Sequence, residues 1–208
     1  MIKYFIWDFD GVLCDSEHLA HTVHNLIFRK YTGLVEIKNK SDYTTVIFKL
    51  MNRMCKDEVD KYYLEHRNMM YANYKQLTLF PVVEFIRTSH IPSVILTATY
   101  EKLVKEVLLH NNIPPEIFSK IIGRETPGTK KEKMLWLLKQ CELNTNEIIY
   151  IGDSPSDVEF CQQLQVPIVV ASYGYFSIPC LKSDNIVAIC NSPENLWETL
   201  HRLIGRIE

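Results

Sequence analysis

The sequence is poor in the features that mark fibrous, low-complexity or strongly charged proteins. Only 7 of its 208 residues are glycine and 9 are proline, which excludes collagen-like and low-complexity chains. Neither sign of charge dominates, because 23 basic residues face 25 acidic ones and the formal net charge is −2. The chain therefore lacks the overall positive field that attracts nucleic acid or anionic lipid. With 47% hydrophobic residues, we expect a folded chain with a buried core.

Long apolar runs and paired cysteines are lacking as well. The first apolar run ends at Asp8 and is too short for a signal peptide or a membrane span. No CxxC spacing occurs, so we expect neither a disulfide framework nor a cysteine metal site. The six cysteines are Cys14, Cys55, Cys141, Cys161, Cys180 and Cys190. We expect a cytoplasmic protein with reduced thiols that binds neither membranes nor nucleic acid, and its oligomeric state stays open.

Short apolar runs alternate with helical patterns over most of the chain. The expected strands cover residues 3–7, 93–96, 120–122, 148–151, 167–171 and 186–189. The expected helices cover residues 82–88, 101–110, 131–140, 157–164 and 193–203. This alternation predicts crossover connections and a mostly parallel sheet. The fold class is therefore expected to be α/β, with a Rossmann-like parallel sheet flanked by helices.

Residues 16–78 interrupt the alternation. Apolar residues recur there at helical spacing, and no run of strand type separates them. We therefore expect a small all-helical domain inserted after the first strand, with a core formed by residues 1–15 and 79–208. Three histidines, His18, His21 and His24, follow one another at spacing three in this segment. We expect them on a polar helical face and not at a metal.

Acidic side chains follow two of the predicted strands at the point where each strand ends. Asp8 and Asp10 come after the first strand, and Asp153 and Asp157 come after the strand near residue 150. Ligands of parallel sheets bind at the carboxyl ends of the strands, so we expect these carboxylates to converge. Asp-x-Asp alone would equally fit a solvated turn, but the second acidic strand end favours a cation between the acids. Oxygen ligands of this kind suit Mg²⁺.

Two further segments have the chemistry of a phosphate site. Thr97 and Ala98 follow a predicted strand and precede a helix, where free backbone N–H groups can bind phosphate. Lys130 and Lys131 open the next helix, where a positive charge opposes the helix dipole unless an anion binds beside it. Lys130 is the preferred phosphate ligand, and Lys131 remains the alternative.

In this order, DFDGVLCDS (8–16), Thr97, Lys130 and GDSPSD (152–157) resemble the four motifs of the haloacid dehalogenase-like hydrolase superfamily. Residues 80–113 resemble the phosphoglycolate phosphatase-like branch. That branch places a helical cap after the first motif, and the 16–78 insertion matches the cap only in position and class. The sequence departs from the pattern at two points. Val82 stands where relatives often carry glycine, and Lys130 lacks the proline that often follows.

The resemblance implies a role for each acid. Asp8 would be the nucleophile that becomes an aspartyl phosphate, and Asp10 would be the general acid and base. Mg²⁺ would be held by Asp8, by Asp153 and by the backbone carbonyl of Asp10, with support from Asp157. The phosphoryl group would be bound by Thr97, the N–H of Ala98 and Lys130.

The function implied by the resemblance is a Mg²⁺-dependent phosphatase for a small phosphorylated metabolite. Asp10 argues against a dehalogenase or a phosphonate-cleaving enzyme, which use no acid at that position. Two alternatives stay open, namely a sugar phosphomutase and a non-catalytic binding module with the same fold. In the cap, Glu17 and Arg53 are candidate substrate ligands, although a first-turn helix acid and a surface charge are equally ordinary readings.

Overall fold

The computed structural model describes residues 1–32, 53–175 and 183–205. Its centre is a six-stranded parallel sheet with the order β5-β4-β1-β6-β7-β8. The strands are β1 (Tyr4–Trp7), β4 (Ser93–Leu96), β5 (Lys120–Ile122), β6 (Ile148–Gly152), β7 (Ile168–Ala171) and β8 (Ile186–Cys190). The chain moves from β1 to one side of the sheet and returns to the other side at β6. The carboxyl ends of β1 and β6 therefore form the switch point at which such sheets bind ligands.

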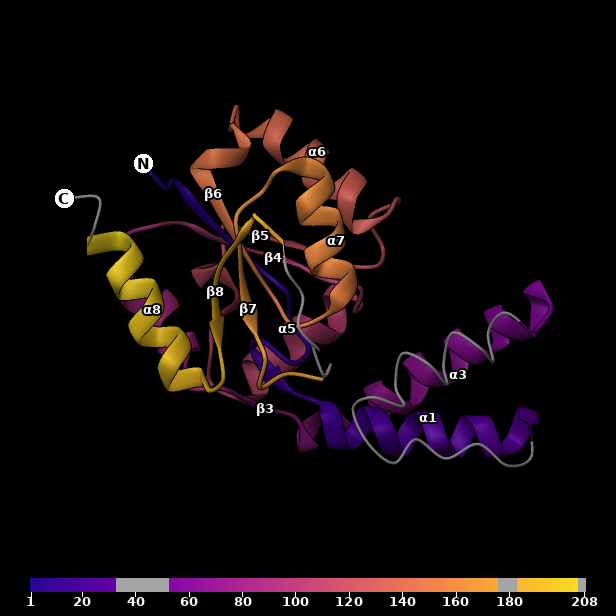
Figure 1. The fold of residues 1–208 in the computed structure, drawn as a ribbon. Coiled ribbons are helices and arrows are strands. Elements are labelled where there is room, and N and C mark those ends of the chain that lie inside the picture. The colour runs from indigo at the N-terminus through magenta and orange to yellow at the C-terminus, as the bar shows by residue number, and fades with distance from the viewer. Residues whose placement is uncertain (33–52, 176–182, 206–208) are drawn as a thin grey trace.

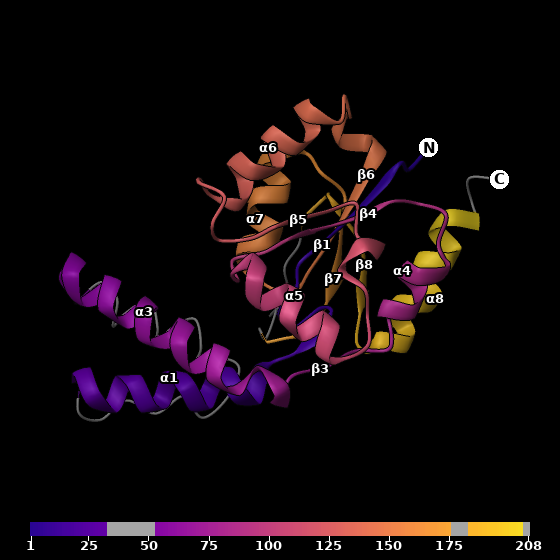
Figure 2. The ribbon, with the colours of Figure 1, turned by 180° about the vertical axis from the view of Figure 1, so that it is seen from behind.

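Helices cover both faces of this sheet, as Figures 1 and 2 show. They are α4 (Val83–Thr88), α5 (Glu101–His110), α6 (Lys130–Gln140), α7 (Pro155–Leu164) and α8 (Pro193–Gly205), and the short 3-10 turns are η1 (Tyr74–Gln76), η2 (Pro115–Ile117) and η3 (Thr145–Glu147). Alternate strand residues point to opposite faces. Phe5 and Trp7 pack into the core beneath α4, α5 and α8, whereas Ile6 packs with α6 and α7. The expected Rossmann-like α/β fold is confirmed.

A helical pair stands beyond the sheet edge, formed by α1 (Glu17–Thr32) and α3 (Lys56–Asn73) (Figure 1). At its base, β2 (Cys14–Asp15) and β3 (Thr78–Leu79) pair as a short antiparallel ladder that the sequence did not predict. The ladder joins the point where the chain leaves the core to the point where it returns. The predicted helical pattern near residues 46–54 lies largely outside the described residues.

The expectation that His24 lies on a polar face is wrong. Its side chain is only 6% exposed and stacks on His66, with ring centres 4.4 Å apart. Its Nδ1 also forms a hydrogen bond with the hydroxyl of Tyr62, which is fully buried between α1 and α3. Burial, together with the neighbouring His66 and His21, lowers the pKa of His24 well below its ordinary value. The reason is an aromatic layer between the two helices, which helical spacing alone does not reveal.

Two helices of the core begin earlier than predicted because polar side chains cap them. Thr129 accepts a hydrogen bond from the N–H of Glu132, so α6 begins at Lys130 and not at residue 131. Ser154 accepts one from the N–H of Asp157 in the same way, so α7 begins at Pro155. Such caps satisfy N–H groups that have no partner within the helix. Both caps lie at the switch point, where they fix the first residues of α6 and α7.

The described residues also show whether a helix could span a membrane and whether cysteines are paired. Within it, no helix is both long and apolar enough to cross a membrane. Five cysteines are described and all are free thiols, while Cys180 lies outside the described residues.

Replacement of Ser93 by alanine tests the central sheet. The indole Nε1 of Trp7 donates to the hydroxyl of Ser93 at 3.0 Å, and both residues are buried. Removing the hydroxyl leaves a buried donor without an acceptor, so Ser93→Ala should lower the free energy of unfolding by about 1–3 kcal/mol in urea titrations. Ser172→Ala is the control, because the carbonyl of Cys190 that it leaves also accepts the backbone N–H of residue 172. Equal stability of the two variants would contradict this account of the core.

Candidate active site

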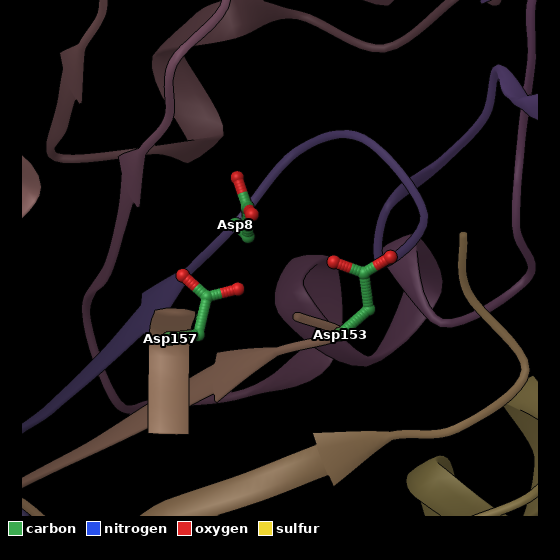
Figure 3. A group of neighbouring side chains, drawn as sticks. All are labelled: Asp8, Asp153 and Asp157. Carbon is green, nitrogen blue, oxygen red and sulfur yellow. The ribbon is translucent and has the colours of Figure 1, made fainter. Parts of the chain in front are cut away.

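The ends of β1 and β6 bring two carboxylates together. The backbone N–H of Asp8 donates to the carbonyl of Ile151 at 2.8 Å, which fixes the first residue after β1 against the neighbouring strand. Asp153 follows β6 directly, and both acids are buried, at 6% and 1% exposure. With Asp157 they form a group whose carboxylate oxygens lie within 4.8 Å of one another. Figure 3 shows the three side chains directed toward a shared space.

Gly11 allows the loop after β1 to pass close to this group. Its φ of +73° lies in the left-handed region, which side chains other than glycine rarely adopt. A Cβ atom at this position would stand 2.2 Å from Oδ2 of Asp153. The glycine therefore serves both the turn and the close approach of the loop to the buried acid.

Asp10 lies in the same loop but outside the group of three. Its Oδ1 accepts a hydrogen bond from the hydroxyl of Ser16 at 2.6 Å, and its Oδ2 accepts one from the hydroxyl of Thr99 at 2.5 Å. Ser16 accepts in turn from the hydroxyl of Tyr175. Both oxygens of Asp10 are thus held by hydroxyl donors, which fixes the orientation of the carboxylate beside the cavity.

Lys130 is the cation of this group. Its Nζ lies 2.6 Å from Oδ2 of Asp8, 2.8 Å from Oδ1 of Asp157 and 3.2 Å from the hydroxyl of Tyr150. Lys131, the alternative that the sequence left open, donates instead to the side chain of Gln163 at 2.8 Å. The first residue of α6 therefore points at Asp8, and the second points away from it.

Asp157 is saturated by donors of the chain itself. Its Oδ1 accepts hydrogen bonds from the ammonium of Lys130 and the hydroxyl of Tyr150. Its Oδ2 accepts hydrogen bonds from the backbone N–H and the hydroxyl of Ser154, at 3.2 and 2.6 Å. Asp153 differs, since its Oδ2 accepts the N–H of Tyr175 while its Oδ1 accepts nothing from the described residues. The free oxygen of Asp153 can therefore take a metal, whereas Asp157 chiefly positions the lysine.

The charges of the group do not balance, because one ammonium faces three buried carboxylates. Burial raises the pKa of Asp8 to about 7, although Lys130 opposes that shift. Burial and repulsion from Asp8 and Asp157 raise the pKa of Asp153 well above its ordinary value. Burial alone would lower the pKa of Lys130, but the two carboxylates that it contacts raise it, so the lysine stays charged. A divalent cation would remove the deficit, and an oxygen-only donor set suits a hard ion.

Thr97 and Ala98 border the same cavity, which has a volume of about 660 Å³. Thr97 is buried, and its hydroxyl accepts the N–H of Thr99 at 3.1 Å, which shapes the turn after β4. Neither Glu17 nor Arg53 is among the described residues that border the cavity. Arg53 is exposed in the turn before α3.

Sequence reasoning missed four residues that hold the acids in place: Tyr150, Tyr175, Ser16 and Thr99. For Tyr150 a signal was available, since a tyrosine inside a fully buried strand needs a partner for its hydroxyl. Tyr175 carries no such signal. It follows β7 and reaches Asp153 and Ser16 only through the fold.

The model of the haloacid dehalogenase-like hydrolase family matches residues 5–171. The chain belongs to this family. It is similar to the phosphoglycolate phosphatase of Chromobacterium violaceum, with 25% identity over 96% of each chain.

Solved structures show the same haloacid dehalogenase-like fold. A predicted phosphatase from Clostridium acetobutylicum aligns with a TM-score of 0.80 and 19% identity, over 97% of this chain and 99% of its own. CbbY from Rhodobacter sphaeroides, solved in complex with phosphate, aligns with a TM-score of 0.74 and 16% identity, over 94% and 96%.

The charge deficit of this haloacid dehalogenase-like site predicts a stability that falls with pH. Asp153 binds its proton more tightly in the folded chain than in the unfolded one, so without a divalent cation the free energy of unfolding should decrease as pH rises above about 4. Asp153→Asn removes the buried charge and should raise that free energy by about 1–2 kcal/mol at pH 7.5 in EDTA. Urea titrations at pH 5 and 7.5 measure both effects.

Asp60→Asn, on the exposed side of α3, is the matched control and should change neither value. Addition of MgCl₂ should stabilise the wild type more than Asp153→Asn. A variant that is less stable than the wild type in EDTA would show that the acid is not destabilising, and would contradict the deficit.

Proposed function

We propose that the chain is a Mg²⁺-dependent phosphatase that hydrolyses small phosphorylated metabolites through an aspartyl phosphate on Asp8. The observation that carries this proposal is the contact of Asp8 with Lys130 at 2.6 Å, beside the free oxygen of Asp153. A nucleophilic carboxylate needs a cation next to it to remain ionised when buried. The similarity to a phosphoglycolate phosphatase supports the same reaction class.

Three groups would hold the metal: the carboxylates of Asp8 and Asp153 and the backbone carbonyl of Asp10. When bound, Mg²⁺ supplies a positive charge that neutralises the phosphoryl oxygens and keeps Asp8 ionised. Asp157 acts through Lys130, because both of its oxygens already accept hydrogen bonds from the chain.

In the first step, a carboxylate oxygen of Asp8 attacks phosphorus while the bond from phosphorus to the ester oxygen breaks. Asp10 gives a proton to the departing oxygen, so the alcohol leaves neutral. The Ser16 and Thr99 hydroxyls keep the Asp10 carboxylate oriented toward the cavity. Asp10 enters this step protonated and ends it as a carboxylate.

In the second step, water attacks phosphorus of the aspartyl phosphate, and Asp10 takes the proton that the water loses. The bond from phosphorus to Asp8 breaks and inorganic phosphate is released. Lys130, the hydroxyl of Thr97 and the N–H of Ala98 bind the phosphoryl oxygens in both steps. These groups are fixed before the substrate arrives, which is the condition for electrostatic stabilisation of a transition state.

The cation requirement and the nucleophile are tested with p-nitrophenyl phosphate. The wild type should turn it over with MgCl₂ and lose activity in EDTA. Asp8→Asn should lower kcat by about 10⁴-fold or more, because it removes the group that forms the covalent bond. Retention of more than about a tenth of wild-type activity by Asp8→Asn would refute the assignment.

The two neighbouring lysines form a matched pair of variants. Lys130→Gln should lower kcat/KM by about 10²–10³-fold, since it removes a positive charge from the transferring group. Lys131→Gln should keep kcat/KM within about twofold, because its ammonium donates to Gln163, whereas Lys130 donates to Asp8 and Asp157. Circular dichroism checks that both variants fold. Equal losses in the two variants would mean that the contact of Lys130 with Asp8 has no part in turnover.

A further inference from the structure

Two arginines from separate parts of the fold meet at the same cavity. Arg67 lies on α3, and Arg124 lies in the segment that follows β5. Their guanidinium carbons lie 5.5 and 5.8 Å from the ring centre of Tyr100, and that of Arg124 also lies 3.9 Å from the ring centre of Tyr63. All four residues border the cavity that contains Asp8 and Lys130. The helical pair and the core thus each bring one positive charge to this wall.

Neither arginine has an acidic partner in the described part of the chain. Arg67 donates only to the side chain of Asn68, at 3.4 and 3.5 Å, and no ion pair involves Arg124. The nearest acid in sequence, Glu125, uses its Oε2 to accept the backbone N–H of Glu101 at 2.8 Å. Two guanidinium groups beside one ring repel each other. The attraction of each guanidinium to the tyrosine rings offsets this repulsion only weakly. An anion between them would be favourable.

His66 borders the same cavity. Its Nε2 is shielded from solvent and has no hydrogen-bond partner among the described residues. Burial and the charge of Arg124 lower the pKa of His66 to about 4, so the imidazole is neutral at physiological pH. A neutral imidazole adds no positive charge, so Arg67 and Arg124 carry the charge of this wall.

The backbone links this wall to the phosphate loop. The N–H of Arg124 donates to the carbonyl of Thr99 at 2.9 Å, and the N–H of Thr99 donates to the hydroxyl of Thr97 at 3.1 Å. Gly123 permits this contact, because a Cβ there would stand 2.5 Å from the backbone nitrogen of Glu101. The backbone of Arg124 is therefore held next to the loop that would bind the transferring phosphate. Arg124, Thr97 and Lys130 all border one cavity.

We propose that Arg67 and Arg124 form a second anion subsite, and that the substrate is a phosphomonoester with a second anionic group. The second group could be a carboxylate or a phosphate, since arginine binds either anion through paired N–H donors. A cavity of about 660 Å³ accommodates a molecule of this size. This inference rests on the proposed phosphatase activity and names the substrate class of that site.

Two matched pairs of substrates test the subsite. 3-Phosphoglycerate differs from glycerol 3-phosphate by a carboxylate in place of a hydroxymethyl group, and fructose 1,6-bisphosphate differs from fructose 6-phosphate by one phosphate. We expect the wild type to prefer the more anionic member of at least one pair by about tenfold in kcat/KM. Arg67→Gln, Arg124→Gln and the double variant should abolish this preference, mainly through KM. Which pair responds distinguishes the carboxylate from the phosphate.

A purely structural role of the arginines has a different signature. If they only hold α3 against the core, both members of each pair and p-nitrophenyl phosphate lose activity together, and the proposal is overturned. It is also overturned if the wild type prefers neither anionic member. Arg124→Lys keeps the charge and should retain part of the preference. Arg87→Gln removes an exposed arginine paired with Glu84, away from the cavity, and should leave every ratio unchanged.

The subsite can be tested separately from the proposed phosphatase activity. If the wild type hydrolyses none of these esters, the proposed function fails, and calorimetric titration of 3-phosphoglycerate, fructose 1,6-bisphosphate and their matched partners then tests the subsite alone. Tighter binding of the more anionic member of either pair to the wild type, lost in the double variant, supports it. Equal binding of both members of both pairs overturns it.

Discussion

Buried negative charge at the ends of β1 and β6 is the constraint around which this molecule is arranged. One carboxylate oxygen each of Asp8, Asp153 and Asp157 lies within 4.8 Å of the others, and among the described residues only Lys130 pairs with these acids. A lysine at the first position of a helix opposes the helix dipole. The ion pairs of Lys130 with Asp8 and Asp157 compensate for this unfavourable position. Gly11 lets the loop approach Asp153, at the cost of a strained turn for any other residue. A divalent cation bound among these acids would remove the deficit.

The same constraint explains why so many groups meet at one cavity. Hydrolysis of a phosphate monoester can require acceleration by up to about 10²¹-fold, while general acid and base catalysis, the role proposed for Asp10, supplies about 10²–10⁴-fold. The remainder must come from positioning and from fixed charges on the transferring group. Lys130 is oriented by Tyr150 and Asp157, and Asp10 is oriented by Ser16 and Thr99. The sheet supplies the rigid frame on which these side chains are held.

The convergence of the acids could be predicted from the sequence, because parallel strands must end at one edge and each acidic motif follows an apolar run. The choice between Lys130 and Lys131 could not, since it depends on the helix start that Thr129 fixes by capping. The contacts of α3 with the cavity could not be predicted from the sequence for a different reason. Which residues of α3 face the core depends on how the helical pair leans over the sheet, so periodicity did not single out Arg67 and left Arg53 as a candidate. Arg53 is exposed in the turn before α3 and is not among the described residues that border the cavity.

The most direct test of the central claim is a crystal structure of the protein grown with MgCl₂ and beryllium trifluoride, a mimic of a phosphoryl group bound to a carboxylate. The account predicts beryllium attached to one carboxylate oxygen of Asp8, with Mg²⁺ bound to the other and to Asp153, and Lys130 in contact with a fluoride. Beryllium trifluoride on another side chain, or Mg²⁺ bound away from Asp153, would contradict it.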